Sequence, residues 1–150
     1  MTEQKMSARA RAYLGITAGF HLSLGSFCLL APHAFMSPSY EGLRNAMPVP
    51  YSLDLAAWGA VFALVGIACA FAAVFGREST ARTSLLLSVI VTGAVAGSFL
   101  ASWVSGTLQG PTGPLVWLTL AFKDMTMLRN PLRNPFEPVV QRVLANTNEG

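Results

Sequence analysis

Three ionisable residues interrupt otherwise apolar stretches of this chain and are its best candidates for chemistry. His21 lies in an uncharged stretch that begins after Arg11, while Lys123 and Asp124 directly follow an uncharged run from Thr83 to Phe122. A histidine and a carboxylate at one membrane depth can share a hydrogen bond or exchange a proton, whereas a lone charge at mid-membrane costs about 2.5–3.5 kcal/mol. Each of these residues therefore needs a partner or a route to the surface.

The elements that must position these residues are helices that cross a membrane. Hydrophobic residues make up 53% of the chain and charged residues only 11%, against about 25% charged residues in soluble domains. The uncharged run is long enough for two spans, and it breaks at the Gly- and Pro-rich segment 106–114, which indicates a turn. The sequence predicts an all-α fold, namely an integral membrane bundle of four transmembrane helices.

The expected helix boundaries follow from local signals. Pro32 should end the first helix, and Gly76 should follow the second as a C-terminal signal. Ser52 should cap the second helix, with Asp54 in its positive first turn. The spans are expected at about 8–30, 53–75, 83–104 and 112–128, followed over 129–150 by a Pro-rich arm and a short amphipathic tail.

Lys and Arg are unevenly distributed between the two sides of this arrangement. Nine of the ten lie at the N-terminus, between the second and third spans or from Lys123 onward, and Arg44 alone lies on the opposite side. Because cytoplasmic segments of membrane proteins are enriched in Lys and Arg, we expect both termini in the cytoplasm and the protein in the plasma membrane. The first apolar stretch is longer than the core of a signal peptide and lacks a cleavage site before Pro32, which argues against cleavage.

These spans place His21 and Asp124 at similar depths. Counted at 1.5 Å per residue from the outer ends, His21 lies about 14 Å down the first span and Asp124 about 18 Å down the fourth. A buried hydrogen bond between them is one interpretation, with Lys123 turned toward the headgroups. In another, Lys123 and Asp124 both sit at the inner interface and His21 is a packing residue. A third interpretation is a proton or ion pathway.

Two spans carry the small-residue spacing that allows close approach of membrane helices. This Gly-x-x-x-Gly pattern occurs in the first and third spans, at Gly15, Gly19, Gly93 and Gly97. A second stripe on the first span lies about 200° away and contains Thr17, His21, Gly25 and Cys28. These faces are expected to pack the four helices together or, alternatively, to join copies of the chain.

Residues near the outer ends of the spans suggest an interfacial loop. Ser37 and Pro38 form a helix-start signal. The tryptophans are expected at the membrane interface, as aromatic belts are, at Trp58, Trp103 and Trp117. Cys28 and Cys69 should lie at different depths and remain free thiols, and the chain has no Cys-x-x-Cys metal or redox motif.

Several segments together resemble a group of known proteins. Phe35-Met36-Ser37-Pro38-Ser39-Tyr40 after the first span, Trp58-Gly59 in the second and the basic tail resemble small four-helix membrane proteins of actinobacteria and their phages. Some of these are grouped with holins, which implies a pore-forming role in lysis, and others are implicated in phage exclusion. The chain also looks like the DoxX-type four-helix family, without a motif that carries over a redox residue. It departs from small multidrug transporters, which need an acidic residue in the first span.

The sequence therefore favours a non-enzymatic membrane protein that acts by assembly, with holin-like permeabilisation or phage exclusion as the sharper hypothesis. The expected partners are the lipid bilayer and either further copies of the chain or a cytoplasmic protein bound to the C-terminal tail. No cofactor and no nucleic acid is expected, because the basic residues sit where lipid headgroups would meet them. The alternative is a small solute or proton carrier that uses His21 and Asp124.

Overall fold

The computed structural model describes residues 6–50, 52–106 and 112–129, and within these ranges the chain is helical and contains no β-strand. The expected arm and tail over 129–150 lie outside the described residues, apart from Arg129. The elements in chain order are α1 (Ala8–Leu30), the 3-10 turns η1 (Pro32–Phe35) and η2 (Pro38–Tyr40), α2 (Glu41–Asn45), α3 (Asp54–Phe75), α4 (Glu78–Val104) and α5 (Thr112–Arg129).

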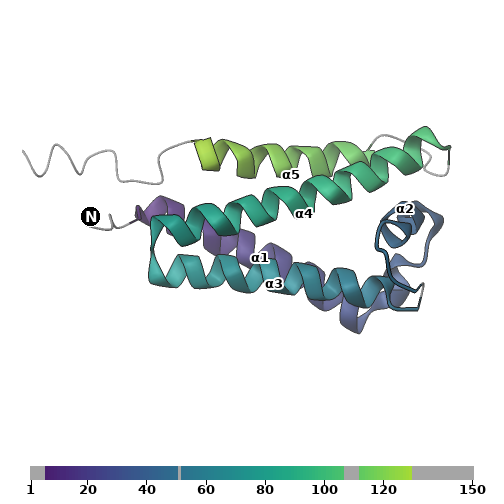
Figure 1. The fold of residues 1–150 in the computed structure, drawn as a ribbon, viewed down its shortest axis with the longest axis horizontal. Coiled ribbons are helices and arrows are strands. Elements are labelled where there is room, and N and C mark those ends of the chain that lie inside the picture. Colours follow the sequence, from purple (N-terminus) through teal and green to yellow (C-terminus); the bar gives the residue numbers. More distant parts are fainter. Residues whose placement is uncertain (1–5, 51, 107–111, 130–150) are drawn as a thin grey trace, which may run out of the picture.

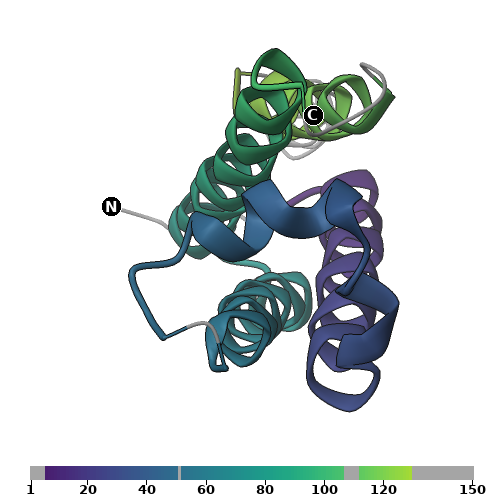
Figure 2. The same ribbon diagram turned by 90° about the vertical axis from the view of Figure 1, so that its right-hand side faces the viewer.

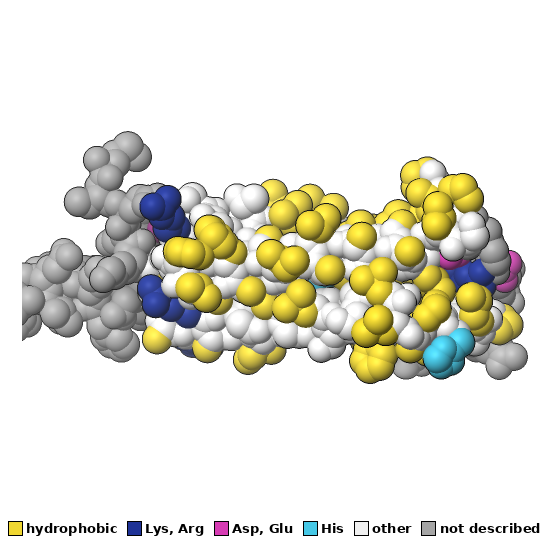
Figure 3. Space-filling model, turned by 90° about the horizontal axis from the view of Figure 1, so that it is seen from below, with side chains coloured by type: hydrophobic (Ala, Val, Ile, Leu, Met, Phe, Trp, Pro, Cys, Tyr) yellow, Lys and Arg dark blue, Asp and Glu magenta, His cyan; other side chains and the backbone are white. Residues whose placement is uncertain are grey.

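Three of the long helices, α1, α3 and α4, are long and apolar enough to cross a membrane. Their outward surfaces carry large hydrophobic side chains that soluble proteins would bury, such as Leu30 (84% exposed), Val74 (71%) and Ile16 (69%). Figure 3 shows hydrophobic side chains along the middle of the molecule and Lys and Arg side chains gathered near one end. The fourth long helix, α5, is shorter, with 18 residues, and is not among these three.

The long helices lie side by side as two close pairs. Helix α1 packs chiefly against α3, and α4 packs chiefly against α5, while α3 and α4 connect the two pairs. Figure 1 shows the alternating course of α3, α4 and α5, and Figure 2 looks along the helices from the end covered by α2. Two hydrophobic clusters fill the interior, one around Leu14 and Leu85 and the other around Phe62 and Val95.

Glycines bring the backbones of α1 and α3 together. A Cβ added to Gly25 would lie 2.9 Å from both Ala63 N and Gly59 O, and one added to Gly66 would lie 2.7 Å from Leu22 Cγ. Such contacts are shorter than side-chain atoms tolerate, so these positions have room only for hydrogen. The stripe of the first span that contains Thr17, His21, Gly25 and Cys28 is therefore the buried one.

The Gly-x-x-x-Gly pairs do not make these contacts. An added Cβ would meet open space, with no atom within 4 Å, at Gly15, Gly19, Gly93 and Gly97. The expectation that these four glycines pack the helices of one bundle together is therefore wrong for the described residues. The physical reason is that a polar stripe on each of α1 and α4 faces inward, which turns the glycine pair of the same helix outward.

Two helix ends follow the sequence signals, while two other boundaries differ. Helix α4 begins at Glu78 and not at about 83, because the polar segment 78–82 is also helical. Helix α1 ends before Pro32, and Gly76 ends α3 in the left-handed conformation at φ 64°, which glycine adopts without a steric penalty. Ser52 does not cap α3, because the N-cap residue is Leu53 and no side chain caps the helix there. The first turn of α3 instead contains Asp54, whose Oδ1 accepts a hydrogen bond from the backbone N–H of Leu55.

A short cap closes the end of the molecule near α2. Arg44 Nε donates to Asp54 Oδ2 at 3.0 Å, and the side chains of this ion pair are 5% and 3% exposed. The Trp58 indole N–H donates to the carbonyl of Leu43 at 2.7 Å. Trp58 is 3% exposed, so its predicted place in an interfacial belt is wrong: its ring anchors α2 to α3 from inside the protein.

Replacing Gly25 with alanine should lower the free energy of unfolding by about 1–3 kcal/mol, because the new methyl group overpacks the contact with Ala63. Gly15→Ala in the same helix is the matched control, and it should leave stability unchanged or raise it by about 0.5–1 kcal/mol through helix propensity. Thermal unfolding in detergent measures both. Equal stability of the two variants would contradict the packing of α1 on α3.

Candidate functional site

The buried carboxylate of Asp124 is the centre of a polar site shared by three helices. Asp124 on α5 is 2% exposed. The Tyr13 hydroxyl of α1 donates to Asp124 Oδ1, and Ser88 Oγ of α4 lies 2.5 Å from Asp124 Oδ2. Because α1 and α5 belong to different helix pairs, the bond from Tyr13 joins the two pairs, while the bond from Ser88 joins α4 to α5 within one pair.

His21 belongs to the same site and is 1% exposed. Its Nδ1 lies 2.9 Å from the carbonyl oxygen of Thr17, and its Nε2 lies 3.3 Å from Ser88 Oγ. His21 and Asp124 are therefore joined through the Ser88 hydroxyl. The direct hydrogen bond considered from the sequence is replaced by a bridge, and the two residues nevertheless occupy one site.

The hydrogen-bond geometry limits where protons can be. A carbonyl only accepts, so His21 Nδ1 carries a hydrogen and donates it to Thr17. Ser88 has a single hydroxyl proton, which it can give either to Asp124 or to His21 Nε2. If Asp124 receives it, Nε2 must be protonated to donate to Ser88; if His21 receives it, Asp124 must be protonated.

These two arrangements contain the same number of protons and have the same net charge. They differ by the movement of two protons along the line from Asp124 through Ser88 to His21. Both keep every contact satisfied, and both are neutral across the histidine and the carboxyl group, which suits an interior that penalises unpaired charge. The arrangement is therefore suited to holding one proton that either end can carry.

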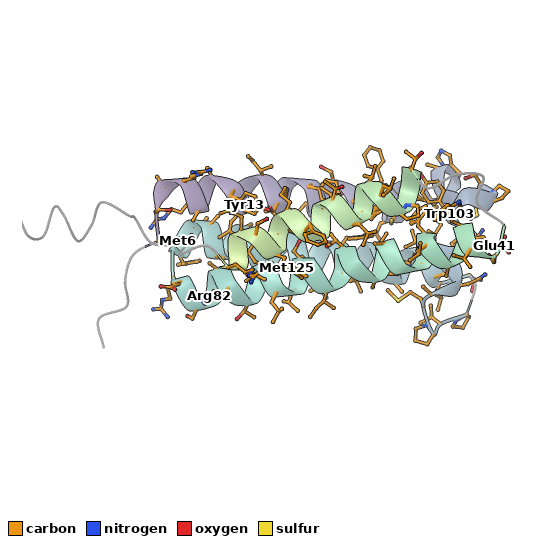
Figure 4. The ribbon with its side chains drawn as sticks, turned by 90° about the horizontal axis from the view of Figure 1, so that it is seen from above. Met6, Tyr13, Glu41, Arg82, Trp103 and Met125 are labelled. Atoms are coloured by element: carbon orange, nitrogen blue, oxygen red, sulfur yellow. The ribbon has the colours of Figure 1, made fainter. Side chains whose placement is uncertain are left out.

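The site is positioned asymmetrically along the molecule. At 1.5 Å per residue, Tyr13 lies about 7.5 Å and His21 about 20 Å from the start of α1. Figure 4 shows Tyr13 in the half of the molecule that contains Met6 and Arg82, away from Glu41 and Trp103. The polar line formed by Tyr13, Asp124, Ser88 and His21 therefore runs from near the N-terminal end of α1 toward the middle of the molecule.

Aromatic rings pack around His21, and those of Trp58 and Trp117 lie near the starts of α3 and α5, toward α2. The His21 ring centroid is 5.3 Å from that of Phe20 and 6.1 Å from that of Phe62. Phe62 stacks on Trp58 at 5.6 Å and on Trp117 of α5 at 6.2 Å. These rings place apolar surface between the polar site and the capped end.

Lys123 takes no part in the polar line. It is exposed, and its Nζ lies 4.9 Å from the centroid of the Tyr13 ring, a cation–π distance. This position agrees with the expectation that Lys123 turns away from Asp124. Neighbouring positions on a helix point about 100° apart, so Asp124 faces the protein interior while Lys123 faces outward.

Sequence reasoning missed Tyr13 and Ser88 as members of the site. The available signal was spacing: Tyr13, Thr17 and His21 recur every four residues on α1, so they share one face. Ser88 is the middle of a similar series on α4, with Ser84 and Thr92, and all three are buried. A buried polar series of this kind in an apolar helix indicates a polar contact with a neighbouring helix.

Other chemistries find little support in the described residues. They contain no group of three His, Cys, Asp or Glu side chains that could hold a metal ion. Cys28 and Cys69 are both free and buried, as expected. Comparisons of the chain with protein-family models, with curated proteins and with solved structures find no match.

Removing either end of the line should weaken the same interaction. Asp124→Asn and His21→Leu should each destabilise the protein, and the double variant should lose less than the sum, with a coupling of about 0.5–3 kcal/mol. Unfolding in a detergent series measures the three free energies. The control cycle pairs Asp124→Asn with Ser102→Ala, a buried hydroxyl of α4 that bonds the Ser98 carbonyl. Additive losses for His21 and Asp124 would show that Ser88 does not couple them.

Proposed function

We propose that this chain is a small membrane carrier whose His21, Ser88 and Asp124 site binds and releases a proton. The observation that carries the proposal is the buried line of these three side chains, each 2% exposed or less. Ionisable residues inside membrane helices are rare and commonly form proton relays or ion pathways. A purely structural hydrogen bond would need neither a histidine nor a carboxylate.

The side of access follows from the asymmetry of the site. Tyr13 and the exposed Lys123 lie toward the end where α1 begins, whereas Phe62 and Trp117 lie on the opposite side of His21. In the proposed carrier, protons enter and leave at the N-terminal end in the described conformation. Movement across the whole membrane then requires the two helix pairs to shift so that the aromatic side opens.

The proposal includes α5 as a fourth span in the plasma membrane, with both termini in the cytoplasm. Helix α5 can reach about 27 Å at 1.5 Å per residue, close to the thickness of the hydrocarbon core. Its burial of Asp124 against α1 and α4, two helices long and apolar enough to span, supports this proposal. The nine-to-one distribution of Lys and Arg supports the orientation.

A reporter fused after Gly150 tests this topology. A fluorescent protein should be bright there, and alkaline phosphatase should be inactive, because the former folds in the cytoplasm and the latter needs an external, oxidising compartment. The same reporters inserted after Pro48, on the opposite side, are the control and should give the reverse pattern. An active phosphatase after Gly150 would contradict the proposed topology, through either an inverted orientation or an odd number of spans.

Purified protein in lipid vesicles tests proton movement. With an imposed pH gradient and the membrane potential clamped, the wild type should dissipate the gradient faster than vesicles without protein. Asp124→Asn removes the titratable carboxyl while keeping its size, and it should return the rate to that of empty vesicles. Ser105→Ala, at the capped end, should behave as the wild type. A wild-type rate equal to that of empty vesicles would contradict the proposed carrier.

A second candidate function is permeabilisation of the membrane by assembly of many copies, as in holins, or phage exclusion through such an assembly. The outward glycine pairs favour it, because open space at Gly15, Gly19, Gly93 and Gly97 leaves these faces available to another helix. Association there would bring backbones close without disturbing the interior of one copy.

Overexpression in cells separates this candidate from the carrier. An assembling pore should cause an abrupt, concentration-dependent loss of membrane potential, followed with a potential-sensitive dye. The double variant Gly93→Leu, Gly97→Leu should delay or abolish that loss, because leucine side chains keep the helices apart, while Asp124→Asn should leave it unchanged. Cells that retain full potential at high expression would exclude permeabilisation and leave partner-dependent exclusion.

A further inference from the structure

The Thr17 hydroxyl has an unusual environment for a threonine in this protein. Thr17 is 2% exposed, and its Oγ1 is buried without a hydrogen-bond partner among the described residues. Other helical threonines bond back to a carbonyl one turn earlier, as Thr83, Thr92, Thr119 and Thr126 do. Thr17 gives up this usual bond, although a buried hydroxyl without a partner is energetically unfavourable.

The position of this hydroxyl points to the polar site. Thr17 lies one helical turn after Tyr13 and one turn before His21, on the face of α1 that both residues share. Its hydroxyl interacts with that of Tyr13 but does not meet hydrogen-bond geometry with it. Polar groups that face each other without a direct hydrogen bond are commonly joined by a water molecule.

We propose that the site holds one buried water molecule, anchored by the Thr17 hydroxyl and bridging it to the Tyr13 and Asp124 end of the polar line. The site offers the partners that it needs: the Thr17 hydroxyl, a tyrosine hydroxyl and a carboxylate, which meet the two to four polar contacts typical of buried water. The water satisfies Thr17 and adds a proton-exchanging group next to Asp124. This inference concerns the composition of the site and not transport, so failure of the vesicle assay does not decide it.

The sign of a stability change distinguishes a hydrated hydroxyl from an unsatisfied one. Valine has nearly the shape of threonine but no hydroxyl. If water is bound, Thr17→Val removes an anchor and should lower the midpoint of thermal unfolding by about 2–6 °C. If the hydroxyl has no partner at all, the same substitution relieves it and should raise the midpoint, which would overturn the proposal. Thr119→Val, at an exposed position of α5, is the matched control and should change the midpoint little.

A second measurement keeps the proposal testable if Thr17→Val fails to fold. In wild-type protein with labelled threonine methyl groups, solid-state NMR should detect magnetisation transfer from water to the Thr17 methyl. The methyl of Thr92 is the internal control, because that residue is equally buried and its hydroxyl bonds the Ser88 carbonyl. Absence of transfer at Thr17 would overturn the proposal. A rise in the midpoint of thermal unfolding of the wild type when choline chloride is replaced by sodium chloride would also overturn it, since that would identify a bound cation in place of water.

Discussion

The arrangement of this protein depends on the need of one buried carboxyl group for hydrogen-bond partners. Asp124 lies in an interior where an unpaired charge is strongly disfavoured, and it obtains its partners from two other helices, Tyr13 on α1 and Ser88 on α4. Those contacts fix the rotation of α5 so that Asp124 faces inward and Lys123 faces outward. They also fix which faces of α1 and α4 can point to the interior, because Tyr13 and Ser88 must do so.

Two kinds of packing then share the work of holding the helices together. Between α1 and α3, glycines allow backbone contact, as at Gly25 and Gly66, and the gain is mainly van der Waals attraction. Between the two helix pairs, the polar line from Tyr13 to His21 supplies directional hydrogen bonds. The first kind is insensitive to protonation, whereas the second changes whenever a proton is added or removed. Protons on His21 and Asp124 would therefore act on the contacts of α1 with α4 and α5 and on the Ser88–Asp124 bond within the second pair, and not on the packing of α1 against α3.

This division explains how one small chain can support the two functions considered. In these proposals the inward polar face would bind a proton and the outward glycine faces would associate with another helix, and the two faces lie on opposite sides of the same helix α1. The Arg44 and Asp54 ion pair and the Trp58 hydrogen bond keep the far end closed independently of that site. The two proposed functions thus rest on separate residues, and substitutions can test either one alone.

The sequence by itself determined the all-helical class, the three long apolar helices, the helix ends at Pro32 and Gly76 and the free state of both cysteines, because each depends on composition or on neighbours along the chain. It also placed His21 and Asp124 at one depth, since depth follows from counting residues.

Only the tertiary structure decided which face of each helix points inward. Two stripes of small residues on α1 are equally compatible with close packing, and the partners on α3, α4 and α5 select the one with Thr17, His21 and Gly25. The bridging role of Ser88 and the inward place of Trp58 depend on the same choice, because a contact between helices is set by their relative rotation, which no single helix encodes.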